Sequence, residues 1–379
     1  MKKVVVATDS FKGSLSSREV ADAFELGFCA IYPNCEVFKV GIADGGEGTI
    51  DALVNALGGD YIEVEVCNPL HRPIKARYGI VEHGKSAIIE MSTASGLALL
   101  KAEERNPLLT STYGTGEMIA DAIKRGCRNI LLGIGGSATN DGGTGLLRAL
   151  GFRFLDHMGR ELVGGGEILE EIAHIDDSQT IPNLSECQFT VACDVTTPLY
   201  GREGAAFVFA PQKGADIAMV EQLDRGLRNY AQVIAAFNGV DISNMEGAGA
   251  AGGLGGGLKA LLNAQLVRGI DMILSAIHFE QIVKDADIII TGEGQLDRQT
   301  LMGKAPSGVL KIATELNIPT IAIGGKVVWC EELRACGFDA IEAITPEGMT
   351  LEEAMRPEVA KENVRRTAEK IAKSYTTLW

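Results

Sequence analysis

The chain has 379 residues and a formal net charge of −15, which argues against a nucleic-acid partner, because a phosphate backbone demands clustered Lys and Arg. Hydrophobic residues make up 46% of the chain and charged residues 22%, as in globular proteins, and the length predicts two domains. No apolar run approaches the roughly 18 residues that span a bilayer. The eight cysteines include no C-x-x-C pair, so we expect a cytoplasmic protein with reduced thiols and no membrane contact.

Both ends of the chain alternate short apolar runs with stretches of helical spacing. This alternation predicts parallel strands joined by right-handed helical crossovers, which is the pattern of a doubly wound sheet. The predicted strands are residues 2–8, 35–43, 286–292, 319–325 and 339–345, and the predicted helices are residues 16–28, 305–317 and 330–337.

The middle of the chain has a different pattern, in which strands and helices are mixed. Residues 73–92 form two alternating runs around a tight turn, which predicts an antiparallel hairpin, whereas residues 116–136 predict a helix followed by a strand. The class is therefore α/β with a discontinuous first domain and an inserted mixed α/β domain. The predicted boundaries are residues 1–66 plus 283–379 for the first domain and residues 67–282 for the second.

The segment from Gly79 to Ser86 reads GIVEHGKS and matches the phosphate-binding pattern G-x-x-x-x-G-K-[ST]. A true phosphate loop follows a strand and opens a helix, so that helix N–H groups face the phosphates. Here strand patterns lie on both sides of the match. We therefore interpret residues 82–85 as a hairpin turn in which Gly84 takes a positive φ.

A glycine-rich stretch in a more suitable context follows the strand predicted at residues 129–134 and precedes a helix expected from Thr144. Backbone N–H groups and hydroxyls beside a helix N-terminus can bind phosphate or carboxylate, although a tight connection without a ligand is the alternative. The residues of this candidate anion-binding loop are Gly135, Gly136, Ser137, Thr139, Asn140 and Asp141.

The same stretch contains a rival pattern. Gly133, Gly135 and Ala138 follow a strand with the spacing of a dinucleotide fingerprint, and Asp156 lies about twenty residues further on. Against this interpretation, the pattern does not open directly into a helix. A dinucleotide-dependent oxidoreductase acting on a small hydroxy acid is therefore kept as an alternative.

Three other predicted strands end in charged residues flanked by glycine. Because ligands of parallel sheets bind beyond the carboxyl ends of the strands, we expect these residues at one rim. Any one group alone is explained as a helix cap or surface pair, but together they suit phosphoryl transfer, which needs carboxylates for Mg²⁺, cations for the phosphates and a proton acceptor. The groups are Asp9, Ser10 and Lys12; Asp44 and Glu47; and Glu293, Asp297, Arg298 and Lys304.

Seven motifs are specific in combination, namely ATDSFKGSLSS, ADGGEGT, GTGEMI, GIGGSATNDGG, CDVTTPLYG, GAGAAGGLGGGL and TGEGQLDRQTLMGKAP. Together they resemble the bacterial glycerate kinase family from residue 2 to about residue 373. The resemblance implies phosphorylation of D-glycerate by ATP and Mg²⁺ at the 2-hydroxyl, to give 2-phosphoglycerate, with 3-phosphoglycerate as the alternative product. It also implies a Rossmann-like or flavodoxin-like domain, a second α/β domain and an active cleft between them.

On this hypothesis each candidate residue takes a role. Asp194, which directly follows a predicted strand, is the first choice for the proton acceptor, although an Asx turn explains it equally well, and Asp297 is the second choice. Lys12 and Asp9 complete the catalytic set. The substrate-binding candidates are Ser10, Asp44, Glu47 and Arg298, of which Asp44 and Glu47 are also the metal candidates; the nucleotide-binding candidates are the residues of the candidate anion-binding loop together with Glu293 and Lys304.

Besides the oxidoreductase, a non-catalytic sugar-acid binding protein is a further alternative, which would bind glycerate without consuming ATP. The expected partner is the small substrate alone, and the expected assembly is a monomer or a homodimer.

Overall fold

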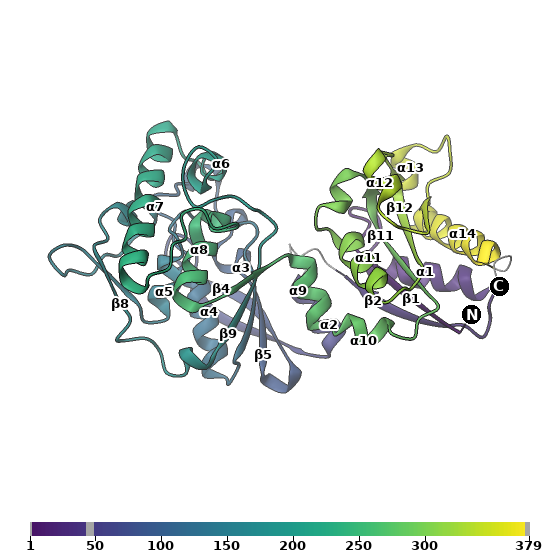
Figure 1. The fold of residues 1–379 in the computed structure, drawn as a ribbon, viewed down its shortest axis with the longest axis horizontal. Helices are drawn as coiled ribbons and strands as arrows, with labels where there is room; N and C mark the ends of the chain where they lie inside the picture. Colours follow the sequence, from purple (N-terminus) through teal and green to yellow (C-terminus); the bar gives the residue numbers. More distant parts are fainter. Residues whose placement is uncertain (1, 43–48, 376–379) are drawn as a thin grey trace. The chain divides into compact units, whose positions relative to one another are not determined.

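The computed structural model describes residues 2–42 and 49–375, and the chain divides into two compact units. Unit 1 consists of both chain ends, residues 1–44 and 273–379, and unit 2 consists of residues 45–272. Each unit has a hydrophobic core of its own. Figure 1 shows the strands of each unit with the helices that cover them.

Unit 1 is built on a sheet in which all neighbouring strands are parallel. Its described strands are β1 (Lys3–Thr8), β2 (Glu36–Gly41), β11 (Ile288–Leu296), β12 (Thr320–Val327) and β13 (Ala340–Ala343), in the order β13-β12-β11-β1-β2. The Val and Ile runs of β1 and β11 are fully buried, as strands covered on both faces require. The doubly wound sheet predicted from the sequence is confirmed.

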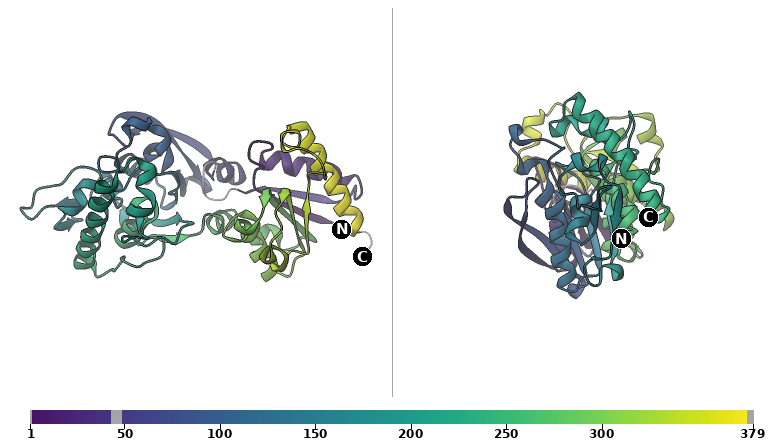
Figure 2. Two further views of the ribbon diagram at one scale, coloured as in Figure 1. Left: turned by 90° about the horizontal axis from the view of Figure 1, so that it is seen from above. Right: turned by 90° about the vertical axis from the view of Figure 1, so that its left-hand side faces the viewer.

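Helices cover this sheet, and two of them come from opposite ends of the chain. The described helices are α1 (Ser17–Cys29), α10 (Phe279–Val283), α11 (Ala305–Glu315), α12 (Glu331–Ala335), α13 (Leu351–Ala354) and α14 (Pro357–Tyr375); α9 (Gly269–Ala276) spans the second boundary in sequence. Helix α1 begins with a capping box, because Ser16 accepts the N–H of Glu19 while the Glu19 carboxylate accepts the N–H of Ser16. Helices α1 and α14 lie side by side (Figures 1 and 2).

Unit 2 contains a mixed sheet with the order β10-β9-β6-β5-β4-β3. Its strands are β3 (Asp60–Cys67), β4 (Pro73–Val81), β5 (Ser86–Glu90), β6 (Asn129–Gly133), β9 (Gln188–Ala192) and β10 (Gln265–Val267). The pairs from β5 to β10 are parallel, whereas β3, β4 and β5 form an antiparallel meander. Two short strands, β7 (Arg153–Leu155) and β8 (His174–Asp176), form a separate antiparallel pair.

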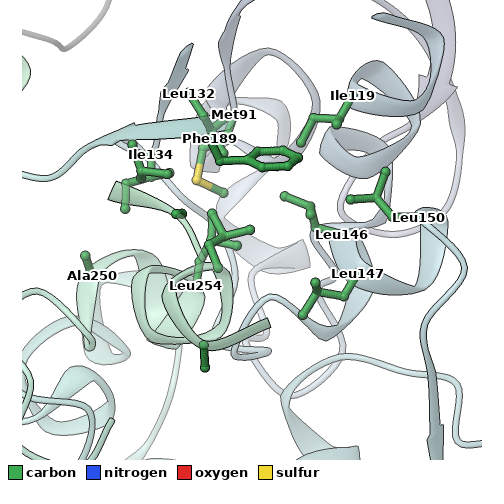
Figure 3. Packing of buried hydrophobic residues seen from close by; sticks show 14 of the residues in the cluster. Met91, Ile119, Leu132, Ile134, Leu146, Leu147, Leu150, Phe189, Ala250 and Leu254 are labelled. Carbon is green, nitrogen blue, oxygen red and sulfur yellow. The ribbon is translucent and has the colours of Figure 1, made fainter. Parts of the chain in front are cut away.

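The helices of unit 2 enclose a core against this sheet. They are α2 (Thr49–Leu57), α3 (Ser92–Ser95), α4 (Tyr113–Lys124), α5 (Thr144–Ala149), α6 (Ala205–Phe209), α7 (Ile217–Asn238) and α8 (Ala250–Leu262). Figure 3 shows Leu146 of α5 and Leu254 of α8 packing towards Phe189 of β9. This core fixes the connection from β6 to α5, which carries the candidate anion-binding loop.

The hairpin interpretation of Gly79 to Ser86 is confirmed. Strands β4 and β5 pair antiparallel with Gly79 opposite Ile88 and Val81 opposite Ser86, and Gly84 has a φ of 89° in the turn. The match to the phosphate-binding pattern therefore opens no helix, and it is a coincidence of residue types.

The predicted domain boundaries differ from the division of the structure. The sequence pattern places residues 45–66 in the first domain, but β3 pairs along its whole length with β4, and the Ile50 N–H of α2 donates to Glu90 of β5 at 3.0 Å. These contacts make residues 45–66 part of unit 2. Residues 273–282, predicted in the inserted domain, belong to unit 1, where the Ile282 carbonyl accepts from the Lys3 ammonium.

Within residues 2–42 and 49–375, no helix is both long enough and apolar enough to cross a membrane.

The contact between α1 and α14 yields a stability prediction. A Cβ atom at Gly27 would lie 2.0 Å from the Arg365 carbonyl oxygen, so α1 and α14 can approach this closely only because position 27 has no side chain. We expect Gly27→Ala to lower the free energy of unfolding by about 2–3 kcal/mol, because the backbone at Arg365 cannot move aside as a flexible side chain could. Urea unfolding measures this loss.

Gly135→Ala is the matched control, because a Cβ atom there meets open space and its φ is not positive. An equal loss of stability in both variants would contradict the close-packing explanation.

Candidate active site

A cavity of about 930 Å³ lies at the carboxyl edge of the unit 1 sheet, and we call it the unit 1 pocket. Its walls are the segment that follows β1, the carboxyl ends of β11 and β12, the segments that follow β11 and β13, α13 with its C-cap and the first turn of α14. Numbered along unit 1, the strand order is 2-1-3-4-5, so the chain reverses its direction of travel across the sheet between β1 and β11. Ligands of open parallel sheets bind at such a switch point.

The polar end of the unit 1 pocket combines residues that follow β1 with residues of β11. Asp9, Ser10 and Lys12 line it from the segment after β1, and Glu293 lines it from β11. The Asp9 N–H donates to the Gly292 carbonyl at 2.9 Å, and Asp9 Oδ1 accepts the Ser10 N–H at 2.6 Å. Residues of two of the three strand-end clusters expected at one rim thus line the same pocket, whereas the third cluster, Asp44 and Glu47, lies outside the described residues.

Glu293 and Lys304 form the central ion pair of this polar end. Lys304 is the N-cap of α11, and its ammonium donates to Glu293 Oε2 at 3.1 Å. The Glu293 side chain is 10% exposed, and its Oε1 atom has no hydrogen-bond partner among the described residues. A buried carboxylate oxygen of this kind costs about 1–3 kcal/mol, so it indicates a donor or cation supplied by a ligand.

Asp297 and Arg298 form hydrogen bonds and an ion pair with neighbouring residues of unit 1. Asp297 also lines the pocket, but it caps a 3₁₀ turn: Oδ1 accepts the Gln299 N–H at 2.8 Å and Oδ2 accepts from the Gln295 amide at 2.7 Å. The hydrogen bond from Gln295 is the first of the causes that lower the pKa of this carboxyl, which makes Asp297 a weak base. Arg298 is not among the residues that line the pocket, and it pairs with Glu332 at 3.2 Å in an exposed position.

The candidate anion-binding loop lies at the carboxyl edge of the unit 2 sheet. Gly136 has a φ of 71°, and its carbonyl accepts the Leu97 N–H at 2.9 Å. Ser137, Thr139 and Asn140 are buried, and the Thr139 hydroxyl and both polar atoms of the Asn140 amide have no partner within the described chain. These groups are donors and acceptors that an anion or ordered water at the loop could use.

Lys213 anchors this loop, and the sequence analysis did not single it out. Its ammonium is buried and donates to Ser137 Oγ and to the Thr139 carbonyl, at 2.7 Å each. Burial lowers the pKa of Lys213 to about 7. The only signal in the sequence is a lysine between Gln212 and Gly214 in an otherwise uncharged segment, which is too common a pattern to identify.

The Asp141 side chain accepts hydrogen bonds from the first turns of α4 and α5. Its carboxylate accepts the Thr112 N–H and hydroxyl at 2.8 Å, the Gly143 N–H at 3.1 Å and the Gly145 N–H at 3.2 Å. Burial raises the pKa of this carboxyl, and the four donors offset that effect. Both oxygens are therefore engaged in holding α5 against α4, which disfavours the predicted ligand-binding role of Asp141.

Asp194 lies at the same sheet edge as the candidate anion-binding loop, because β9 is the parallel neighbour of β6. Its side chain is exposed, and its Oδ1 atom accepts the Gly269 N–H at the start of α9 at 2.9 Å. The carboxylate is thus both held in place and accessible, so its role as proton acceptor stays a prediction.

The dinucleotide alternative is wrong on structural grounds. Asp156 closes β7, which belongs to the separate two-stranded sheet and not to the parallel strands that follow the fingerprint. Its carboxylate accepts the Met158 and Arg160 N–H groups and pairs with the Arg160 guanidinium at 2.8 Å. Asp156 therefore forms a turn and is not placed to bind a ribose.

The two metal candidates, Asp44 and Glu47, lie outside the described residues. Among residues 2–42 and 49–375, no group of three or more His, Cys, Asp or Glu side chains is arranged to hold a metal ion. The prediction that the active cleft lies between the two domains also stays a prediction.

The structure defines a two-unit α/β protein. Unit 1 has a charged pocket at the switch point of its parallel sheet, and unit 2 has a polar glycine-rich loop, which is a composition typical of sites for small anionic ligands. Comparisons with known proteins give the family. The model of the glycerate kinase family matches residues 4–376, so the chain belongs to the glycerate kinase family.

Similar proteins cover nearly the whole chain. Glycerate kinase from Bacillus subtilis (strain 168) is 46% identical over 98% of this chain and 97% of its own, and glycerate 2-kinase from Escherichia coli (strain K12) is 44% identical over the same shares. The crystal structure of a Salmonella typhimurium LT2 protein described as glycerate kinase 2 matches with a TM-score of 0.89 and 46% identity, over 99% of this chain and 98% of that one. The resemblance, the fold class and the assignment as a kinase are thereby confirmed.

The buried lysine yields a prediction of pH dependence. An unfolded lysine has a pKa near 10.5, whereas the folded Lys213 has a pKa of about 7. Between these values the unfolded state binds a proton that the folded state has lost, so the stability contributed at this position rises with pH. We expect the thermal midpoint of Lys213→Met, relative to that of the parent protein, to fall steadily as the pH is raised from 7 to 10.

Measuring the difference between the two proteins cancels the titration of the thiols, most of which have a pKa raised by burial. A difference that stays flat with pH would show that folding does not lower the pKa of Lys213.

Proposed function

We propose that the protein transfers the terminal phosphoryl group of ATP to D-glycerate at the 2-hydroxyl, giving 2-phosphoglycerate, with Mg²⁺ as the metal. Membership of the glycerate kinase family carries the substrate and the reaction type. The 2-position is favoured because the Escherichia coli relative, at 44% identity, is a glycerate 2-kinase. Phosphorylation of the 3-hydroxyl is the alternative. The family leaves the oxidoreductase and the non-catalytic binding protein without support.

The lining of the unit 1 pocket supports the proposal of a nucleoside triphosphate bound with Mg²⁺. Lys12, Lys304 and Lys326 line it, and ammonium groups neutralise phosphate oxygens. Magnesium in phosphoryl transfer is held by one or two carboxylates together with the phosphates, so a large protein cluster is not required. Glu293 Oε1, which no described residue pairs, is the oxygen available for this purpose. When bound, Mg²⁺ would neutralise the charge that develops on the transferred group.

The chain's own residues would perform three tasks. Lys304 at the N-terminus of α11 would hold phosphate oxygens, where the positive end of the helix dipole adds to its charge. Lys12 and Ser10, both in the segment after β1, would orient the acid or the phosphates. The candidate anion-binding loop, held in shape by Lys213, would provide N–H and hydroxyl donors for a carboxylate or phosphate.

The proton acceptor must be a carboxylate that the hydroxyl of the substrate can reach. Asp297 is disfavoured, because both of its oxygens already accept hydrogen bonds. We propose Asp194, the first choice from the sequence, or Glu293 for this role, and Asp9 and Lys12 stay in the predicted catalytic set. Asp194 is accessible, and the Oε1 atom of Glu293 has no partner in the described part of the chain.

The reaction itself is the first test. The purified protein is expected to release ADP from ATP and Mg²⁺ only when D-glycerate is present, and the phosphorus NMR spectrum of the product is expected to match 2-phosphoglycerate. L-Glycerate serves as the matched control acid. ADP release without D-glycerate, or a product that matches 3-phosphoglycerate, would overturn the substrate or the position respectively.

Glu293→Gln tests the carboxylate of the polar end. Glutamine keeps the shape and can still accept from Lys304, but it cannot take a proton or hold a cation strongly. We expect kcat to fall about 100-fold, the lower range for removal of a general base, with the fold intact by circular dichroism.

Glu315→Gln, at the exposed end of α11, is the control and should retain full activity. Asp194→Asn decides between the two candidates. If Glu293→Gln retains near-normal kcat while Asp194→Asn loses it, Asp194 is the acceptor and Glu293 is neither the base nor a ligand of the metal.

A further inference from the structure

The lining of the unit 1 pocket also includes a group of apolar side chains, which we call its apolar end and which glycerate and phosphate would not use. Apolar side chains line the pocket from the ends of β12 and β13, from α13 and its C-cap and from the segment before α13, where Thr345 and Glu347 also line it. The apolar residues are Val327, Ile344, Met349, Leu351 and Met355. A wall of this composition suits a flat, weakly polar group, whereas an acid or a phosphate gains nothing from it.

Specific contacts fix this apolar end in place. The Asn363 amide of α14 donates to the sulfur of Met349 at 3.5 Å, and the Thr345 hydroxyl donates to the Gly325 carbonyl at 2.6 Å. Gly13, which follows Lys12, has a φ of 79°, and a Cβ atom there would lie 2.9 Å from the terminal methyl group of Met355. The segment after β1, whose Lys12 lines the polar end, therefore also closes against the apolar end.

Two of these apolar side chains face solvent. Leu351 is 70% exposed and Met355 is 37% exposed, although both line a cavity. Exposed apolar surface costs free energy that a bound ring would recover, and methionine adapts readily to the face of an aromatic ring. The exposure is thus explained if a ligand with an aromatic part covers both side chains.

The dimensions of the pocket agree with such a ligand. Its volume of about 930 Å³ lies in the upper part of the range for sites that take drug-sized molecules. Glycerate would fill a small part of this space, whereas a nucleotide has a charged end and an aromatic end that correspond to the two ends of the pocket.

We propose that the apolar end of Met349, Leu351 and Met355 binds the base of the nucleotide, while Lys304 and Lys12 bind its phosphates. The nucleotide then lies along the carboxyl edge of the unit 1 sheet. This assignment rests on the proposed use of ATP, and it adds that residues of unit 1 bind both the base and the phosphates of the nucleotide.

The test uses the full chain with neutral substitutions, so that the charge near the phosphates does not change. Leu351→Asn and Met355→Gln are combined, and Leu26→Asn on α1 is the matched control, because Leu26 is 67% exposed and lies outside the pocket. Isothermal titration with ADP gives Kd, and steady-state kinetics give KM for ATP and for D-glycerate. Thermal unfolding checks that the variants are folded.

We expect the double variant to raise the Kd of ADP and the KM of ATP about tenfold, which corresponds to the loss of two or so buried methylene contacts, and to leave the KM of D-glycerate unaltered. The control should match the parent protein in all three values. An unchanged Kd for ADP, or a rise in the KM of D-glycerate alone, would overturn the assignment of the base.

The outcome separates this inference from the proposed function. If the parent protein converts D-glycerate with ATP but the double variant binds ADP normally, only the assignment of the base fails. If the parent protein neither binds ADP nor releases it from ATP with D-glycerate, the proposed use of ATP fails first.

Discussion

The parallel pairing of β1 with β11 is the constraint on which the site depends. It joins residues almost 300 positions apart, with Val4 opposite Ile288 and Thr8 opposite Gly292, and it continues one step further as the Asp9 N–H donates to the Gly292 carbonyl. This register places the segment that starts with Asp9 beside Glu293. Because the side chains of a strand alternate between its faces, a slip of one residue would turn Glu293 away from the pocket.

This pairing requires both ends of the chain, and α1 and α14 close unit 1 around it. The contact at Gly27 contributes more to that closure than the ion pair between Lys361 and Glu19 at 2.9 Å, since both side chains of the pair are more than 40% exposed and such pairs are worth little in water. Non-local pairing of this kind is slow to form, because the loop-closure entropy is lost before the contacts are gained. The pocket therefore depends on the last helix of the chain, although no charged residue of the polar end lies in that helix.

Local patterns predicted most of this architecture. Buried Val and Ile runs, helical spacing and capping residues depend only on neighbours in sequence, so β1, β11 and α1 agree with their predicted bounds within two residues at most ends. The charged residues at strand ends could be predicted because a parallel sheet gathers them at one edge. The first domain boundary could not, because whether β3 pairs with β4 or with a strand of unit 1 is decided by tertiary contacts.

The individual roles at the site were harder to predict, for a related reason. Asp141 and Asn140 are adjacent and equally polar in sequence, but the fold gives Asp141 four donors and leaves both polar atoms of the Asn140 amide without a partner in the described chain. Lys213 lies more than 70 positions from the loop that it holds. Whether a polar side chain finds hydrogen-bond partners within the protein depends on such distant contacts, and a local sequence pattern cannot predict them.

Several buried polar atoms that have no hydrogen-bond partner in the described part of the chain lie at the two candidate sites, and they point to bound ligands. Buried polar atoms without partners are costly, and some of those among the described residues lie at a candidate site in each unit. Glu293 lies within β11 of unit 1, and Thr139 and Asn140 lie in the connection between β6 and α5 of unit 2. Stability alone would favour apolar residues at these positions. The Glu293 carboxylate beside Lys304 and the Asn140 amide in the candidate anion-binding loop are explained if a ligand completes their hydrogen bonds. Part of the stability that these groups cost the folded protein is then regained when the ligand binds.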